Sequence, residues 1–227
     1  MSKLKNENME QDVLIEYSTR FLHYYRNNKA VVWGIGIGLV LTIGLVIGYF
    51  IYSSQQESEA QVLLGTAEEY YREGELENAL YGSEEEFTLG FTQIADNYGR
   101  TSSGNLSNYY SAVIYYELEQ YEDALDYIEQ FNIPDGIIGV APLSLHAVIL
   151  SELGQLEAAG QKFIQAAEWV ENDSTTPYNL LEAAIAFESA DEQDKALEQL
   201  DTILSDYPNS GQQSEAQRMK GAIAARS

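Results

Sequence analysis

The 227-residue sequence contains no cysteine and only two histidines. The missing cysteines exclude disulfide bonds, thiol catalysis, cysteine-based metal sites and attachment through a lipidated N-terminal cysteine. The two histidines, His23 and His146, lie far apart in the sequence. We therefore expect no histidine pair that could bind a metal ion or perform acid–base chemistry, and we expect His146 to be a packing residue.

Catalytic and cofactor-binding motifs are also absent from the sequence. It contains no glycine-rich phosphate-binding loop and no nucleophile motif. The acidic run at residues 84–86 lacks the alternating acidic pattern and central glycine of an EF-hand loop, and we expect it to be exposed. The sequence therefore predicts that the protein is not an enzyme and has neither a cofactor nor a metal site.

Basic residues are scarce, with 12 Lys and Arg against 36 Asp and Glu, which gives a net charge of −24. Residues 1–52 have a net charge of +1, whereas residues 53–227, with seven basic and thirty-two acidic residues, have a net charge of −25. Such a domain repels nucleic acid and attracts basic segments of other proteins. We expect protein partners and no nucleic acid; a solvated acidic surface without a binding role is the open alternative.

One long segment has no charged residue at all. Residues 30–52 form an apolar run that, as a helix, is roughly 34 Å long, enough to cross about 30 Å of hydrocarbon. Trp33 at one end and Tyr49 and Tyr52 at the other suit the headgroup level. A cleaved signal peptide fits poorly, because the run is too long and no small-x-small cleavage site follows it. The sequence predicts a single transmembrane helix.

Basic residues near the two ends of this run predict its orientation. Arg20, Arg26 and Lys29 precede it, whereas Arg72 is the one basic residue in the twenty positions that follow. Because cytoplasmic flanks are enriched in Lys and Arg, residues 1–29 are predicted to be cytoplasmic, residues 30–52 to span the membrane and residues 53–227 to be extracytoplasmic. In a bacterium this places the anchor in the inner membrane and the domain in the periplasm.

The predicted anchor contains four glycines on one side. At about 100° per residue, Gly34, Gly38, Gly44 and Gly48 fall within an arc of about 120° and form two small-xxx-small spacings. Such a face lets another helix pack closely, either from a second copy, which would make a homodimer, or from another protein. The alternative is that glycine is simply common in membrane helices.

The short segment before the anchor also has a helical pattern. Val13, Tyr17, Phe21 and Tyr24 recur at helical spacing, which predicts a small amphipathic helix at the membrane surface or against a partner. Asn27 and Asn28 are predicted to end this helix before the anchor begins.

Beyond the anchor, alanines recur in pairs that are twelve residues apart. Each first alanine is followed three residues later by a large residue, and each second alanine follows a short polar turn. The four pairs are Ala67/Ala79, Ala112/Ala124, Ala147/Ala159 and Ala184/Ala196, with Tyr70, Tyr115, Leu150 and Phe187 as the large residues. Small residues let antiparallel helices approach closely, and this pattern is typical of the tetratricopeptide repeat. An irregular all-α bundle is the alternative.

The spacing of the second alanines predicts how the repeats are arranged. They are 35 and 37 residues apart in the last three repeats but 45 apart in the first two, which predicts an eight-residue insert at residues 80–87. A last helix, from about Gln212 to Arg226, is expected to cover the end of the stack. The predicted fold is all-α: one transmembrane helix, then an α-solenoid of about four tetratricopeptide-like helix pairs and a C-terminal capping helix.

The repeat phase also predicts which residues line a binding groove. In stacked helix pairs of this kind the first helices line the concave face. By resemblance to tetratricopeptide proteins, this phase places a set of tyrosine, charged and apolar residues on that face, which we call the predicted groove: Tyr71, Arg72, Tyr109, Val113, Tyr116, Glu117, Tyr178 and Glu188. Leu64 and Leu181 are predicted to point inward in the same phase. We expect the groove to accept apolar and basic peptide segments.

The whole layout resembles the YfgM family of ancillary Sec translocon subunits. Similar features are the segment from Glu7 to Tyr52, including Arg20-Phe21 and the lead-in from Asn27 to Lys29, followed by a tetratricopeptide domain. The insert, the tyrosine content and the strong acidity depart from that family. The resemblance implies a chaperone-like adaptor beside the translocon, with translocon subunits, exported clients or periplasmic chaperones as partners. It implies no catalytic residues. The alternative function is a structural scaffold for envelope assembly or cell division.

Overall fold

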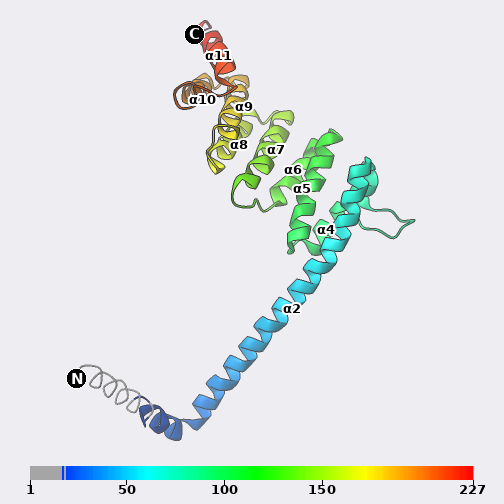
Figure 1. Ribbon diagram of the computed structural model, residues 1–227, viewed down its shortest axis with the longest axis vertical. Coiled ribbons are helices and arrows are strands. Elements are labelled where there is room, and N and C mark those ends of the chain that lie inside the picture. Colours follow the sequence, from blue (N-terminus) through cyan, green and yellow to red (C-terminus); the bar gives the residue numbers. More distant parts are fainter. Residues whose placement is uncertain (1–16, 18, 227) are drawn as a thin grey trace, which may run out of the picture. The chain divides into compact units, whose positions relative to one another are not determined.

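The structure is a computed structural model that describes residue 17 and residues 19–226. The described residues are helical or irregular and include no strand, so the protein is all-α (Figure 1). The chain divides into two compact units, Met1–Gln55 and Gln56–Ser227.

In the first unit, a short helical segment precedes the long helix α2 (Lys29–Glu73). Residues 19–27 are helical, and Asn28 is the one non-helical residue before α2 begins. The side-chain amide of Asn28 donates to the Tyr24 carbonyl at 3.2 Å. The predicted break at the asparagine pair is therefore confirmed. Val13, the first residue of the predicted amphipathic pattern, lies outside the described residues.

The apolar run at residues 30–52 is helical throughout, as predicted. The N-terminal part of α2 is long and apolar enough to cross a membrane, a property that a signal sequence near the N-terminus shares. Its large side chains are exposed, with Leu45 76% and Val40 68% exposed. The unit therefore presents a helix whose apolar surface is not covered by the described chain.

The second unit begins inside α2 and continues through a series of helices that pack in chain order. Their bounds are α3 (Leu76–Tyr81), α4 (Phe91–Tyr98), α5 (Ser102–Glu117), α6 (Tyr121–Gln130), the 3₁₀ turn η1 (Ile137–Gly139), α7 (Val140–Glu152), α8 (Leu156–Trp169), α9 (Thr175–Ser189), α10 (Gln193–Asp206) and α11 (Gln213–Ala224). Each helix from α4 onward packs against the next one along the chain, and α5 also contacts α7, as α7 contacts α9. This is the sequential stacking of repeat-like helix pairs (Figure 1).

The alanine pattern identifies the core of these pairs. All eight paired alanines are 0% exposed, and the four large residues that follow are also buried, from 1% for Phe187 to 8% for Tyr70. Because an alanine has only a methyl group, helices can approach closely wherever two alanines meet. The four predicted helix pairs are therefore confirmed.

The turn inside each pair has the same backbone geometry. Gly74, Glu119, Gly154 and Asp191, each five residues before a second alanine, all have a positive φ between 59° and 80°. In each turn the following N–H donates to the carbonyl of the large residue, as in Glu75 to Tyr70 and Glu192 to Phe187. This left-handed residue ends the first helix and reverses the chain.

The predicted insert lies slightly later than expected. Leu80 is completely buried at the end of α3 and belongs to the core. The irregular segment runs from Gly82 to Gly90 and splits the second helix of the first pair into α3 and α4. The predicted position, residues 80–87, was wrong by two to three residues, because Leu80 continues the helix and packs inward.

The last helix, α11, covers the end of the stack as predicted. It packs against α10, and its Ala216 and Ile223 are 0% and 1% exposed in the same core cluster as Phe187 and Ile203. The opposite side of α11 is polar, with Gln217 and Arg218 exposed. A terminal helix with one buried and one polar side is what an open stack of repeats requires.

Candidate protein-binding surface

The predicted groove residues all lie on the first helices of their pairs, and none is buried. The residues from α2 and α5 lie close together, and two more residues come from α9. The set is Tyr71 and Arg72 in α2, Tyr109, Val113, Tyr116 and Glu117 in α5, and Tyr178 and Glu188 in α9. Leu64 and Leu181 are 7% and 8% exposed. These two were expected to point into the groove, but both belong to the core, because they pack between helices.

A hydrogen bond joins the first two pairs within this surface. The Tyr71 hydroxyl donates to the Glu117 carboxylate at 2.8 Å, from α2 to α5. Burial, and then the neighbouring Glu117 carboxylate, raise the pKa of Tyr71 to about 12. The phenol therefore stays protonated and keeps donating at any physiological pH.

A series of aromatic contacts extends from Tyr71 to the rings of α5 and its neighbours. Tyr71 lies 5.9 Å from Tyr110, whose ring stacks on Phe91 at 4.7 Å between centroids. Tyr109 lies 6.2 Å from Tyr110 and 5.4 Å from Phe131. The sequence prediction missed Tyr110, because the repeat phase assigns its position to contacts between helices. Rigid rings that keep part of their surface in water are well suited to protein contacts.

A second aromatic group lies around Tyr116 and Tyr178. Tyr116 is 5.8 Å from Tyr121, and Tyr178 is 46% exposed. Burial raises the pKa of Tyr178, and the nearby Glu182 and Tyr116 raise it further. Burial also raises the pKa of Glu182 itself, a half-buried carboxyl that the sequence prediction did not select. Tyr116 and Tyr178, from pairs two repeats apart, are therefore near each other and beside an acidic group.

Besides Tyr71 and Glu117, two further predicted groove residues have partners within the chain. The Glu188 carboxylate forms an ion pair at 2.8 Å with the guanidinium of Arg226, which follows α11. The Arg72 guanidinium donates to the Glu68 carbonyl of its own helix at 3.4 Å. At the Glu188 end of the surface, the carboxylate is therefore already paired with Arg226, whereas the Tyr116 and Tyr178 rings remain partly exposed.

The four anchor glycines have open space beside them. A methyl group added at Gly34, Gly38, Gly44 or Gly48 would meet nothing within 4 Å in the described chain. The flat face that they form is therefore not used for packing within the described residues.

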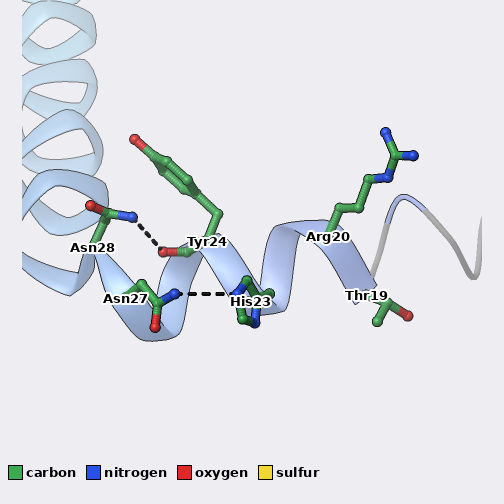
Figure 2. Close-up of a pocket in the computed structure, with 6 residues that line it drawn as sticks. All are labelled: Thr19, Arg20, His23, Tyr24, Asn27 and Asn28. Carbon is green, nitrogen blue, oxygen red and sulfur yellow. Dashed lines mark hydrogen bonds between the residues drawn. The ribbon is translucent and has the colours of Figure 1, made fainter.

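The short helical segment before α2 lines a shallow hollow of about 520 Å³ (Figure 2). The side-chain amide of Asn27 lies 3.3 Å from the His23 Nε2 atom. The full set is Thr19, Arg20, His23, Tyr24, Asn27 and Asn28. These side chains have polar groups, but most of the surface that they present to the hollow is apolar, and the set contains no carboxylate or thiol.

His146 behaves as the sequence predicts. It is partly buried in α7, and burial, with the nearby Lys162, lowers its pKa to about 4. The imidazole is therefore neutral at physiological pH. Among the described residues, no three His, Asp or Glu side chains are grouped so that they could hold a metal ion.

A scan against protein-family models, a search of the curated proteins and a search of the solved structures each returned no match. The function is therefore inferred from the residues of the chain itself.

Proposed function

We propose that this protein is a membrane-anchored tetratricopeptide adaptor that binds other proteins at the extracytoplasmic face. The observation that supports this most directly is the row of partly exposed tyrosines on the first helices of a stack whose core is built by the paired alanines. Repeat stacks of this kind present long surfaces for protein binding.

The exposed apolar helix supports membrane anchoring. Soluble monomers rarely expose contiguous apolar patches larger than a few hundred Å², and the run at residues 30–52 exposes nearly every side chain. The basic residues before this run favour a cytoplasmic N-terminus and a periplasmic repeat domain in a bacterial inner membrane. The open glycine face of the anchor would allow it to dock against another membrane helix.

The resemblance to the YfgM family supports a more specific role as an accessory of the Sec translocon. In this role the anchor docks beside the channel, and the tyrosine surface meets emerging chains or periplasmic chaperones. A scaffold for envelope assembly or cell division is the second candidate function, and the open glycine face favours it if the anchor pairs with its own copy.

Crosslinking from the anchor distinguishes these two roles. A photoreactive amino acid at Gly38 of the full-length protein, in living cells, should crosslink to translocon subunits if the adaptor role is correct. Recovery of the protein itself alone, or with one envelope-assembly complex, would support the scaffold instead. A probe at Gly36, on the other side of the helix, is the matched control and should crosslink less.

Substitutions on the tyrosine surface test the binding role. Tyr116→Ala with Tyr178→Ala should reduce the crosslinking of exported chains to the full-length protein at least tenfold, because two aromatic contact residues are lost. Ile138→Ala removes a similarly exposed apolar side chain outside the first helices and should have little effect. Unchanged crosslinking in the double variant, with the fold intact by circular dichroism, would disprove binding at this surface.

A further inference from the structure

A second hollow lies between α8, α9 and α10, away from the predicted groove residues. It encloses about 390 Å³. Its apolar lining includes Ile164 from α8 and Leu180 from α9, and its acidic lining includes Glu168, Glu171, Glu198 and Asp206. No Lys or Arg lines it. The hollow therefore combines a few apolar side chains with four carboxylates that have no basic neighbour in its wall.

The nearby basic residues pair with carboxylates elsewhere. Lys195 binds Glu157 at 2.7 Å, and Lys220 binds Asp201. Within the described chain, none of the four carboxylates of the hollow takes part in an ion pair. The negative charge of the hollow is therefore not neutralised by the protein's own side chains.

A largely buried side chain in the same hollow has no hydrogen-bond partner within the described chain. Gln199 of α10 is 7% exposed and lines the hollow, and its side chain makes no hydrogen bond with any described residue. Its amide atoms are not among the buried polar atoms without a partner, so they face the open hollow, where a ligand donor or acceptor can reach them. This observation is independent of the acidic residues.

The hollow continues into a neighbouring one of about 420 Å³. The two share Asp206 and Tyr207, and the second adds Asp173 and Ser210. The hydroxyl oxygen of Ser210 is buried and has no hydrogen-bond partner among the described residues. Together the two hollows form an acidic track, defined here by Glu168, Glu171, Glu198, Asp206 and Asp173, with two unused polar groups.

We propose that this acidic track binds a basic linear segment of a partner protein, with an arginine side chain in the hollow beside Gln199. A guanidinium has five N–H donors and a weakly hydrated planar face, which match carboxylates that lie beside aliphatic side chains such as Ile164 and Leu180. Its N–H groups can donate to Glu171, Glu198 and the Gln199 carbonyl oxygen. The Tyr207 ring offers a further aromatic contact for the cation.

The chemistry of the lining favours arginine over a metal ion. Within the described residues no group of three His, Asp or Glu side chains could hold a metal ion. A lysine ammonium is compact and strongly hydrated, and it lacks the planar face that can lie against the aliphatic side chains of the hollow. The proposal goes beyond the proposed function, because the track shares no residue with the predicted groove.

The test is binding of a labelled peptide to the full-length protein in nanodiscs of uncharged lipid. The probe is a short flexible peptide with two arginines, and its binding is followed by fluorescence anisotropy. The double variant Glu171→Gln with Glu198→Gln should weaken binding at least tenfold. Replacement of the peptide arginines by neutral citrulline should abolish binding, and replacement by lysine should weaken it several-fold.

Matched variants separate a specific site from general charge attraction. Glu122→Gln with Asp126→Asn removes the same charge from exposed positions on α6 and should leave peptide binding within about twofold. Equal weakening by both double variants, or equal binding of the lysine peptide, would overturn the proposal. Tyr116→Ala with Tyr178→Ala should not affect this binding, so failure of the track and failure of the tyrosine surface are distinguishable.

Discussion

The two halves of the helix stack build the same repeat from different side chains. In the half formed by α2 to α6, tyrosines occupy the position of the large residue, Tyr70 and Tyr115, and more tyrosines pack around them. In the half formed by α7 to α11, the same position is Leu150 and Phe187, and the other buried core residues are alanine, leucine, isoleucine and Phe163. The alanines themselves are equally buried in both halves.

The difference shows what a tyrosine core requires. The Tyr70 hydroxyl donates to Glu86 of the insert at 2.8 Å, and the Tyr115 hydroxyl lies 3.1 Å from that of Tyr81. Each phenol thus needs a polar partner near the edge of the core. Phe187 needs none and packs directly against Gly160, where a methyl group would come within 2.7 Å of its ring. The large core residues of the first half therefore extend to polar partners at the edge of the core, whereas Phe187 of the second half does not.

The largest expected effect comes from truncation of a large core residue in the half formed by α7 to α11. Phe187→Ala should lower the free energy of unfolding by about 3–5 kcal/mol, because the ring is 1% exposed and its removal leaves a cavity. Tyr115→Phe, which removes only a hydroxyl, should cost about 1 kcal/mol. Urea unfolding of the full-length protein in nanodiscs, followed by circular dichroism, measures both. A loss below 1 kcal/mol for Phe187→Ala would show that the second half is loosely packed.

A middle-sized effect on stability comes from pH. Acid should destabilise the second half through His146, and alkali should destabilise the first half through Tyr71. His146 in α7 has a folded pKa of about 4, below its unfolded value of 6.5. Its contribution to stability is therefore complete above pH 6.5 and is lost as the pH falls through about 4. Tyr71 has a folded pKa raised to about 12, so its contribution is complete below pH 10 and is lost as the pH rises toward 12.

His146→Gln isolates the acid side of this dependence. After a discount for partial exposure, the histidine should account for about 1–2 kcal/mol of the stability lost between pH 6.5 and pH 4. Between pH 6.5 and pH 4, the free energy of unfolding of the variant should therefore fall by about 1–2 kcal/mol less than that of the unchanged protein. At alkaline pH, the two proteins should lose stability equally. Identical acid limbs in the two proteins would show that other groups dominate, and His146 would then titrate normally.

The sequence predicted the repeats well, because small residues at fixed spacing determine how closely helices can approach. The eight paired alanines, the last helix and the apolar helical segment at residues 30–52 were all placed from spacing and charge alone. The insert was misplaced because its flanks, Leu80 and Gly90, differ from a regular helix only in their tertiary contacts: Leu80 is buried, and Gly90 lies against the Leu80 backbone. Tyr110 and Glu182 were missed since side-chain exposure depends on neighbours from other repeats.

The smallest expected effect lies in the turns, where each half has one glycine and one other residue in the left-handed conformation. Glu119 has φ 59° in the first half and Asp191 has φ 62° in the second, at the positions that Gly74 and Gly154 occupy in the other two turns. A non-glycine residue there costs roughly 1–2 kcal/mol, but glycine also costs about 0.5–1 kcal/mol in unfolded-chain entropy. Glu119→Gly should therefore stabilise the protein by about 0.5–1 kcal/mol.

Asp191→Gly should gain less than Glu119→Gly, because aspartate tolerates the left-handed region better than glutamate does. Gly154→Ala is the reverse control: a methyl group at this position has open space, so any loss of stability must come from the backbone conformation and not from a clash. The three midpoints of urea unfolding should thus rank Glu119→Gly above Asp191→Gly above Gly154→Ala. A gain for Gly154→Ala would mean that the turn relaxes out of the left-handed region, and the common turn geometry would then be set by packing of the two helices alone.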